Sequence, residues 1–184
     1  EFKVYRPDPE NPGSISNNNI SAIYEDDKGQ LWVGTNGGGL NRFNREMETF
    51  SHYRHNPMEP KSLSSDFILT IYEDKSGALW VGTQDGLNKF NPDTDDFTIY
   101  KNDPNAPDSI SYNGVLSVFQ DRQGVLWVGT FAGLNKYNPQ NGTFTRYQTQ
   151  LGYLNGLISG VIISIFEDHS GEFWIGTGAG LHRM

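Results

Sequence analysis

Apolar and polar residues recur along this chain with a period close to 47 residues. The four tryptophans lie at positions 32, 80, 127 and 174, so the steps between them are 48, 47 and 47 residues. Each tryptophan follows Leu or Phe and precedes Val or Ile, then Gly and Thr, as in the sequence LWVGT at residues 79–83. A period of this length, with no helix-length segment inside it, predicts a repeated unit of short β-strands.

Four segments of strand character recur in each unit. The first, ISAIYED at residues 20–26, has Ile20, Ala22 and Tyr24 on one face and Ile23 on the other, which predicts an inner strand packed between neighbouring sheets. A tight Asp-x-x-Gly turn leads into the tryptophan strand, and a glycine loop leads into an alternating strand such as LNKF at residues 87–90. The fourth segment carries Phe and Tyr three positions apart and predicts an outer strand.

This pattern predicts an all-β fold, a β-propeller of four blades with four antiparallel strands each, in a single domain over residues 1–184. The blade repeats cover about 1–48, 49–95, 96–142 and 143–184. The chain begins with a fourth-strand segment, Phe2 and Tyr5, and stops at Met184 at the end of a third strand. We therefore expect the N-terminal strand to complete the last blade of a closed ring. The alternative is that the chain is a segment of a larger ring.

Composition and charge exclude several classes of function. The chain has 35% hydrophobic and 20% charged residues, which is typical of a globular protein without membrane insertion. The absence of cysteine excludes disulfides, thiolate nucleophiles and cysteine zinc sites. A net charge of −8 disfavours binding to nucleic acid. No metal-ligand spacing, phosphate-binding loop or nucleophile elbow occurs, so we predict no catalytic residue, no metal site, no cofactor and no enzyme activity.

A candidate binding surface follows from the strand order. In each blade the loop that enters the first strand and the loop between the second and third strands emerge on the same face, here called the loop face; the opposite face is the turn face. The residues of these loops differ between units while the framework repeats, as expected for a site built on a scaffold. Their amides and aromatic rings suit the hydroxyls and apolar faces of sugars. The predicted ligand-binding residues are Asn18, Asn19, Asn36, Asp66, Phe67, Gln84, Asp85, Tyr112, Asn113 and Phe131.

A purely structural interpretation of these residues stays open, because Asn, Asp and Gly also form turns and aromatic rings also cap cores. Three other repeated sets are interpreted as structural. The aspartates before the turn glycine are expected to cap turns, the tryptophans to pack between sheets, and the basic residues of the third strands to face solvent. The aspartates are Asp26, Asp74, Asp121 and Asp168, and the basic residues are Arg42, Lys89, Lys136 and Arg183.

The repeat resembles that of the two-component regulator propeller family. The second unit carries the resemblance most fully, from SLS at residues 62–64 through EDKSGALWVGT at 73–83 to GLNKFNP at 86–92, and the fourth unit departs most, with Phe173 and Ile175 around its tryptophan. The resemblance covers nearly the whole chain. It implies a β-propeller in the periplasmic or extracellular sensor region of a bacterial hybrid histidine kinase, associated with the detection of carbohydrates.

These observations together predict a non-catalytic sensing propeller that binds an oligosaccharide on its loop face. One alternative is a structural module that holds neighbouring domains of a longer chain or forms a homodimer. A second is a polysaccharide lyase or glycoside hydrolase, because the Asp-x-x-Gly-x-x-Trp turn resembles the aspartate box of sialidase propellers. The scattered arginines and the lack of an acid–base pair disfavour the enzyme.

Overall fold

The computed structural model describes residues 1–149 and 157–184, and every regular element in this part of the chain is a β-strand. Residues 150–156, inside the fourth predicted unit, lie outside the described residues. The first sheet contains β1 (Ile20–Glu25), β2 (Leu31–Thr35), β3 (Leu40–Asn44) and β4 (Thr49–Tyr53). The second contains β5 (Ile68–Glu73), β6 (Leu79–Thr83), β7 (Gly86–Asn91) and β8 (Asp96–Tyr100).

The third and fourth sheets follow the same order. The third contains β9 (Val115–Gln120), β10 (Leu126–Thr130), β11 (Gly133–Asn138) and β12 (Thr143–Tyr147). The fourth has three strands, β13 (Ile162–Glu167), β14 (Phe173–Thr177) and β15 (Gly180–Arg183). All neighbouring strands in the four sheets are antiparallel and adjacent in the sequence, so the predicted four-stranded blade is confirmed for the first three sheets, while the fourth sheet has three strands within the described residues.

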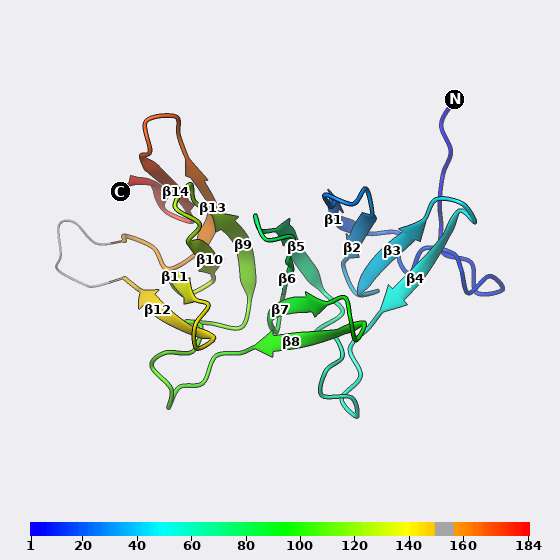
Figure 1. The fold of residues 1–184 in the computed structure, drawn as a ribbon, viewed down its shortest axis with the longest axis horizontal. Coiled ribbons are helices and arrows are strands. Elements are labelled where there is room, and N and C mark those ends of the chain that lie inside the picture. Colours follow the sequence, from blue (N-terminus) through cyan, green and yellow to red (C-terminus); the bar gives the residue numbers. More distant parts are fainter. Residues whose placement is uncertain (150–156) are drawn as a thin grey trace.

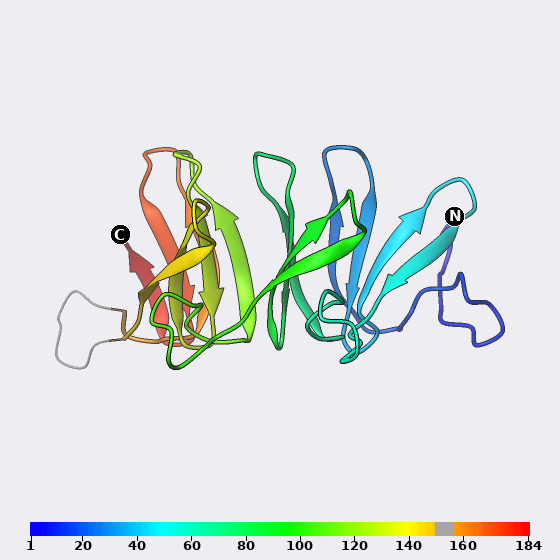
Figure 2. The ribbon, with the colours of Figure 1, turned by 60° about the horizontal axis from the view of Figure 1, so that its bottom comes forward.

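The four sheets stand side by side as an open arc (Figure 1). The inner strands β1, β5, β9 and β13 lie toward the concave side, and the outer strands β4, β8 and β12 lie on the convex side. The two chain ends lie at opposite ends of the arc in both ribbon views (Figures 1 and 2).

The predicted completion of the last blade by the N-terminal strand is therefore wrong in this structure. Residues 1–8 are not in a strand, and the ring of Tyr5 packs edge-on against Phe43 and Phe50 of the first sheet, with centroid distances of 5.4 and 5.5 Å. The physical reason is proximity: the aromatic face nearest to this segment belongs to the first sheet, while β15 lies at the far end of the arc.

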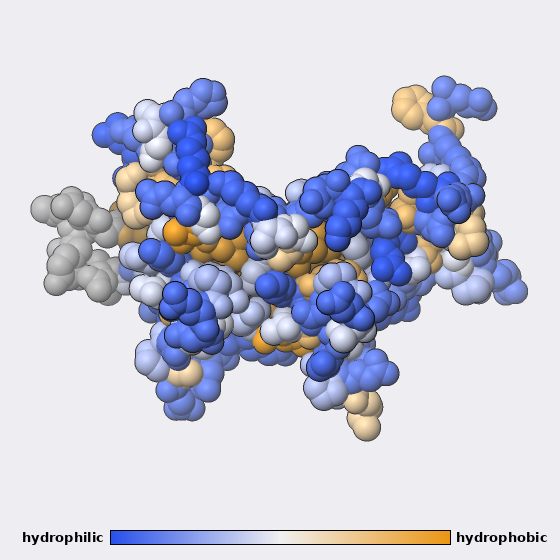
Figure 3. All heavy atoms as spheres, in the orientation of Figure 1, coloured by the Kyte–Doolittle hydropathy of each residue, from blue (hydrophilic) through white to orange (hydrophobic). Residues whose placement is uncertain are grey.

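The hydrophobic core lies between the sheets. Trp32 of the first sheet clusters with Ile68 and Ile71 of the second, and Trp80 of the second sheet clusters with Val115 and Val118 of the third. Figure 3 shows apolar side chains toward the middle of the arc with polar side chains around them. Each central sheet is thus covered on both faces, as the apolar inner strands predict.

The predicted assignment of side chains to the two faces of the inner strand is wrong, because the strand contains a β-bulge. The pairing of β5 with β6 shifts register between Ile68 and Thr70, and the other inner strands shift at the equivalent position. The extra residue changes the phase of the alternation, so Ile68 and Ile71 both reach the core shared with the preceding sheet. By the same shift, Ile20 and Ile23 lie on one face and not on opposite faces.

Candidate functional site

On the loop face, which points downward in Figure 2, the loops that carry the predicted binding residues lie side by side across the first three blades. The surface that these loops form is here called the strip. The Asn36 backbone N–H donates a hydrogen bond to the Asn19 carbonyl at 2.9 Å, and Asn36 forms an antiparallel bridge with Phe67 of the second blade. The Asn113 amide donates to Asp85 Oδ1 at 2.9 Å, which joins the second and third blades. The structure therefore brings the predicted binding residues together from three blades.

Seven of the ten predicted binding residues are exposed, namely Asn18, Asn19, Asn36, Phe67, Gln84, Tyr112 and Phe131. The three rings among them are 42%, 50% and 44% exposed, which leaves part of each ring open to a ligand. Tyr112 and Phe131 meet edge to face with centroids 6.2 Å apart. Such rings can pack against the apolar face of a sugar while the neighbouring amides bond to its hydroxyls.

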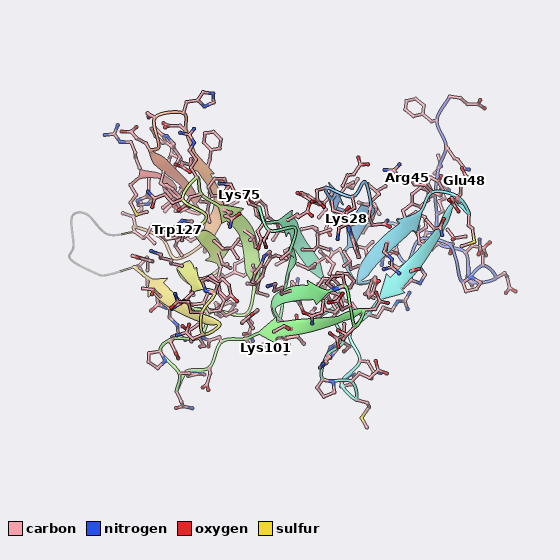
Figure 4. The ribbon with its side chains drawn as sticks, in the orientation of Figure 1. Lys28, Arg45, Glu48, Lys75, Lys101 and Trp127 are labelled. Atoms are coloured by element: carbon pink, nitrogen blue, oxygen red, sulfur yellow. The ribbon has the colours of Figure 1, made fainter. Side chains whose placement is uncertain are left out.

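The side chains of the other three predicted residues form hydrogen bonds with other residues of the protein. Asp66 Oδ1 accepts the His55 backbone N–H at 2.7 Å, and Asn113 Oδ1 accepts the Asn102 backbone N–H at 2.7 Å. Asp85 Oδ2 accepts from Lys101 Nζ at 2.6 Å, directly after β8 (Figure 4). These side chains hold the connectors between blades, so the groups that the strip offers a ligand are mainly uncharged amides and rings.

The turn face is built by the repeated aspartates, and their prediction as turn caps is confirmed. Asp74 Oδ1 accepts the backbone N–H groups of Ser76 and Ala78 at 2.9 and 3.2 Å. Its other oxygen, Oδ2, accepts from Trp80 Nε1 at 2.8 Å. The same bond to the indole recurs in the other three blades at 2.8 to 2.9 Å, and no pattern in the sequence predicts it.

Of the repeated basic residues, Lys136 and Arg183 are exposed as expected, whereas Arg42 and Lys89 are half-buried. In the first three blades these side chains also make a contact that was not expected. They lie over the indole rings in a cation–π arrangement, with Lys89 Nζ 5.4 Å from the Trp80 ring and similar distances for Arg42 over Trp32 and Lys136 over Trp127. Grooves open at these seams, one beside Trp32 and the next beside Trp80. Because the lining repeats from blade to blade, we assign these grooves to packing between blades.

A buried polar network links each of the first three blades to the segment that enters it. In the second blade, Asn88 Oδ1 accepts the Ser64 backbone N–H at 2.9 Å, and Asn88 Nδ2 donates to Ser64 Oγ and to the Val81 carbonyl. Ser64 Oγ lies 2.9 Å from Thr83 Oγ1. Asn41 and Asn135 make the corresponding bonds in the first and third blades. The constant spacing of 24 residues between Ser64 and Asn88, repeated in Ser111 and Asn135, was the available signal in the sequence.

Hydrogen bonds lower the pKa of two turn aspartates. At Asp74, burial acts in the opposite direction and raises the pKa, but bonds from Ser76, Trp80 and Ala78 outweigh it. At Asp168, bonds from Ser170 and Trp174 lower the pKa. A carboxyl group with a lowered folded pKa stabilises the fold fully above its unfolded pKa, about 3.9, and this contribution is lost as the pH falls through the folded value.

Replacing Asp74 with asparagine should therefore lower the free energy of unfolding by roughly 1 kcal/mol near neutral pH, allowing for solvent screening at this half-buried turn. The difference from the wild-type chain should shrink as the pH falls below about 4. Urea unfolding at several pH values measures it, with Asp93→Asn in the exposed β7–β8 turn as the control. A difference that stayed constant with pH would contradict the role given to the charge.

Residues 1–149 and 157–184 also bear on metal binding and on insertion into a membrane. No cluster of three or more His, Asp or Glu side chains is placed to hold a metal ion there. No helix in the same residues has the length and apolar character needed to cross a membrane.

The model of the family described as two component regulator propeller matches the chain at residues 14–37, 62–85, 109–132 and 156–179, just over half of its length. No protein among the curated sequences matches significantly.

Two solved extracellular domains from B. thetaiotaomicron have a similar structure. The domain of BT3049, assigned to a hybrid two component system, is 29% identical with a TM-score of 0.81 over 92% of this chain and 24% of that one. The domain of BT4673 is 24% identical with a TM-score of 0.77 over 94% of this chain and 22% of that one. The chain thus spans about a quarter of the length of these relatives.

A more distant match is virginiamycin B lyase from Staphylococcus aureus. It is 15% identical, with a TM-score of 0.60, over 90% of this chain and 55% of that one. At this identity the match shows a shared propeller architecture only.

Proposed function

The chain belongs to the two-component regulator propeller family, and on this premise we propose that it forms part of an extracytoplasmic sensor that binds an uncharged oligosaccharide along its loop face. The location is supported by the similarity to extracellular domains of hybrid two component systems. The ligand class is supported by the chemistry of the strip.

The observation that carries the proposal is the strip itself. Phe67, Tyr112 and Phe131 are each about half exposed, and hydrogen bonds between the loops join their blades into one surface. An extended ligand can lie across such a surface and place successive units on successive rings. The carboxylates nearby are engaged, with Asp85 paired to Lys101 and Asp66 bonded to the His55 N–H, so the available polar groups are mainly amides. Amides suit neutral sugars better than acidic ones.

No bond in the ligand needs to break for this function. A ligand held by the loops of three blades favours the relative positions of those blades in which all contacts form together. The free energy that it transmits is limited to the difference between its affinities for the two arrangements.

Isothermal titration calorimetry with neutral and acidic oligosaccharides tests the proposal. We expect heat with at least one neutral oligosaccharide and weaker or no binding of its uronic-acid counterpart. Heat from none of the neutral compounds would count against the proposal and favour a module that only connects other domains. Release of shortened products from any of them would identify an enzyme.

Substitution of the exposed rings identifies the surface involved. Phe67→Ala, Tyr112→Ala and Phe131→Ala should each weaken binding about fivefold, equivalent to ~1 kcal/mol, because each removes one stacking surface. Phe166→Ala is the matched control, since Phe166 is an exposed ring near the turn face of the fourth blade. Equal losses in the control and the three variants would place the ligand elsewhere.

A further inference from the structure

Each of the first three blades is preceded by a connector that follows the same path along the outer strand of that blade. In the second connector the Ser62 backbone N–H donates to the Glu59 carbonyl at 2.9 Å, and the Lys61 carbonyl accepts the Phe97 N–H of β8 at 2.9 Å. The same two bonds recur in the first and third connectors at 2.7 to 3.1 Å. Figure 1 shows the second and third connectors as loops beside β8 and β12. The connectors, which can therefore be compared position by position, are residues 6–19, 54–67 and 101–114.

A basic side chain of the outer strand fastens the connector in two of these blades. In the third blade, Arg146 of β12 donates from Nε to the Ser109 carbonyl and from Nη2 to the Ala106 carbonyl, both at 2.7 Å. In the first blade, His52 Nε2 lies 2.7 Å from the Ser14 carbonyl, which is the counterpart of the Ser109 carbonyl. The bend of the connector thus presents backbone carbonyls as acceptors for a planar group with N–H donors.

The second blade has no such side chain, because Ile99 stands at this position. Ile99 and Arg146 each lie opposite the buried asparagine of the third strand, so they are equivalent in register. Among residues 1–149 and 157–184, no hydrogen bond is donated to the Ser62 carbonyl, the counterpart of the Ser109 carbonyl. The second connector therefore keeps the acceptors and lacks the donor.

A groove of 400 Å³ opens between the second connector and β8, at the place that matches the Arg146 side chain in the third blade. Its lining includes Asn56, Glu59, Ser62, Ile99 and Lys101. The Glu59 and Ser62 carbonyls correspond to the two that accept from the guanidinium in the third blade. The volume falls within the range of sites that hold small groups.

The charge of this groove suits a cation. Glu59 is exposed, and its carboxylate forms no ion pair within the described part of the chain, whereas its counterpart in the third connector is the uncharged Ala106. Lys101, the lysine of the lining, is already paired with Asp85 at 2.6 Å. The second connector therefore offers negative charge beside the acceptors.

We propose that this groove binds a guanidinium group, presented by an arginine side chain of a partner protein. The group takes the place in the second blade that Arg146 fills in the third, donates to the carbonyls of Ser62 and Glu59, and pairs with the Glu59 carboxylate. A planar fork of N–H donors fits several acceptors at one bend better than a lysine ammonium does, and arginine is the side chain that carries it. The site is separate from the oligosaccharide proposed for the loop face.

NMR titration of the isotope-labelled chain with N-acetylarginine methylamide tests the site. We expect saturable shifts of the backbone amide signals of Glu59, Ser62 and Ile99. The citrulline derivative has nearly the same shape but no charge, and it should bind about tenfold more weakly. The lysine derivative should also bind more weakly, because it has no planar fork. Equal binding of the arginine and citrulline derivatives, or no saturable shift of these amides, would overturn the proposal.

A peptide distinguishes a protein partner from a small guanidinium compound. An arginine flanked by two glycines on each side should bind at least as tightly as the arginine derivative, because the groove is open at the surface. Binding of the derivative without binding of the peptide would overturn the assignment to a protein partner.

Ile99→Arg supplies the missing side chain from the chain itself. It should weaken binding of the arginine derivative about tenfold or more, because the groove is then filled, and circular dichroism should show the fold retained. Thr98→Arg is the matched control, since it adds the same charge to the same strand with its side chain on the opposite face. Equal losses in these two variants would overturn the proposal.

Glu59→Gln tests the charge without altering a packed side chain, since Glu59 is exposed. It should weaken binding of the arginine derivative about threefold, a modest loss because the ion pair is open to solvent. Unchanged binding in this variant would contradict the pairing with Glu59. None of these results depends on a ligand at the loop face.

Discussion

Replacing Trp80 with alanine should lower the free energy of unfolding by about 4 kcal/mol. Trp80 is 1% exposed, and its ring packs against Tyr137 of the next blade with centroids 5.1 Å apart. Its removal leaves a cavity between two blades and takes away the indole donor that Asp74 Oδ2 accepts at 2.8 Å. Urea unfolding followed by circular dichroism measures the loss.

Trp174 is the internal control for this prediction. It stands in the same sequence frame and bonds to Asp168 in the same way, but it is only half-buried and lies at the free end of the arc. Trp174→Ala should lower the free energy of unfolding by less than half as much as Trp80→Ala. Equal losses would mean that the bond to aspartate, and not packing between blades, determines the effect.

Replacing Asn88 with alanine should lower the free energy of unfolding by about 3 kcal/mol. Asn88 is fully buried, and its removal leaves the Ser64 N–H and the Val81 carbonyl without their side-chain partner in a space closed to water. The same urea measurement applies. His182 replaces this asparagine in the fourth blade and is only half-buried, so His182→Ala should cost less than 1 kcal/mol. Similar small losses in both variants would show that solvent reaches the network.

The strands and the turn caps could be predicted because the chain repeats them four times. A single Asp-x-x-Gly turn before a tryptophan is a weak signal, but four such turns at one period leave little freedom in strand order. The prediction of Asp74 as a turn cap rested on this repetition, and so did the packing role of Trp80. The bond between them was missed, because no spacing rule for short turns states which oxygen faces the indole.

The open arc could not be predicted from local pattern. Whether blades close into a ring depends on the sum of small angles between sheets, and a complementary pair of end segments is equally compatible with a larger assembly. The bulge at Ile68 was missed for a related reason: it changes no residue type, only the phase of the strand.

Only part of the candidate site could be predicted from the sequence. Strand order was enough to place the ten predicted residues on one face. It could not separate Asp66 and Asn113, which hold connector amides, from Asn36 and Gln84, which are exposed. Aspartate and asparagine bond equally well to a backbone amide and to a sugar hydroxyl, so only the path of the connector decides which role each one takes.

The identity of the internal boundaries bears on how such a protein changes over evolutionary time. At each internal boundary, the glycine of one tryptophan strand packs against a β-branched side chain of the next blade, and a turn N–H donates to a Glu or Gln side chain of that blade. Because this contact is the same at each boundary, duplication or loss of one whole 47-residue unit joins surfaces that already fit. A genetic event in phase with the repeat therefore alters the number of blades without creating a new core. An event out of phase separates a strand from its partners and removes the core between two sheets. Selection on this fold thus permits recombination in steps of one blade and opposes it at other positions.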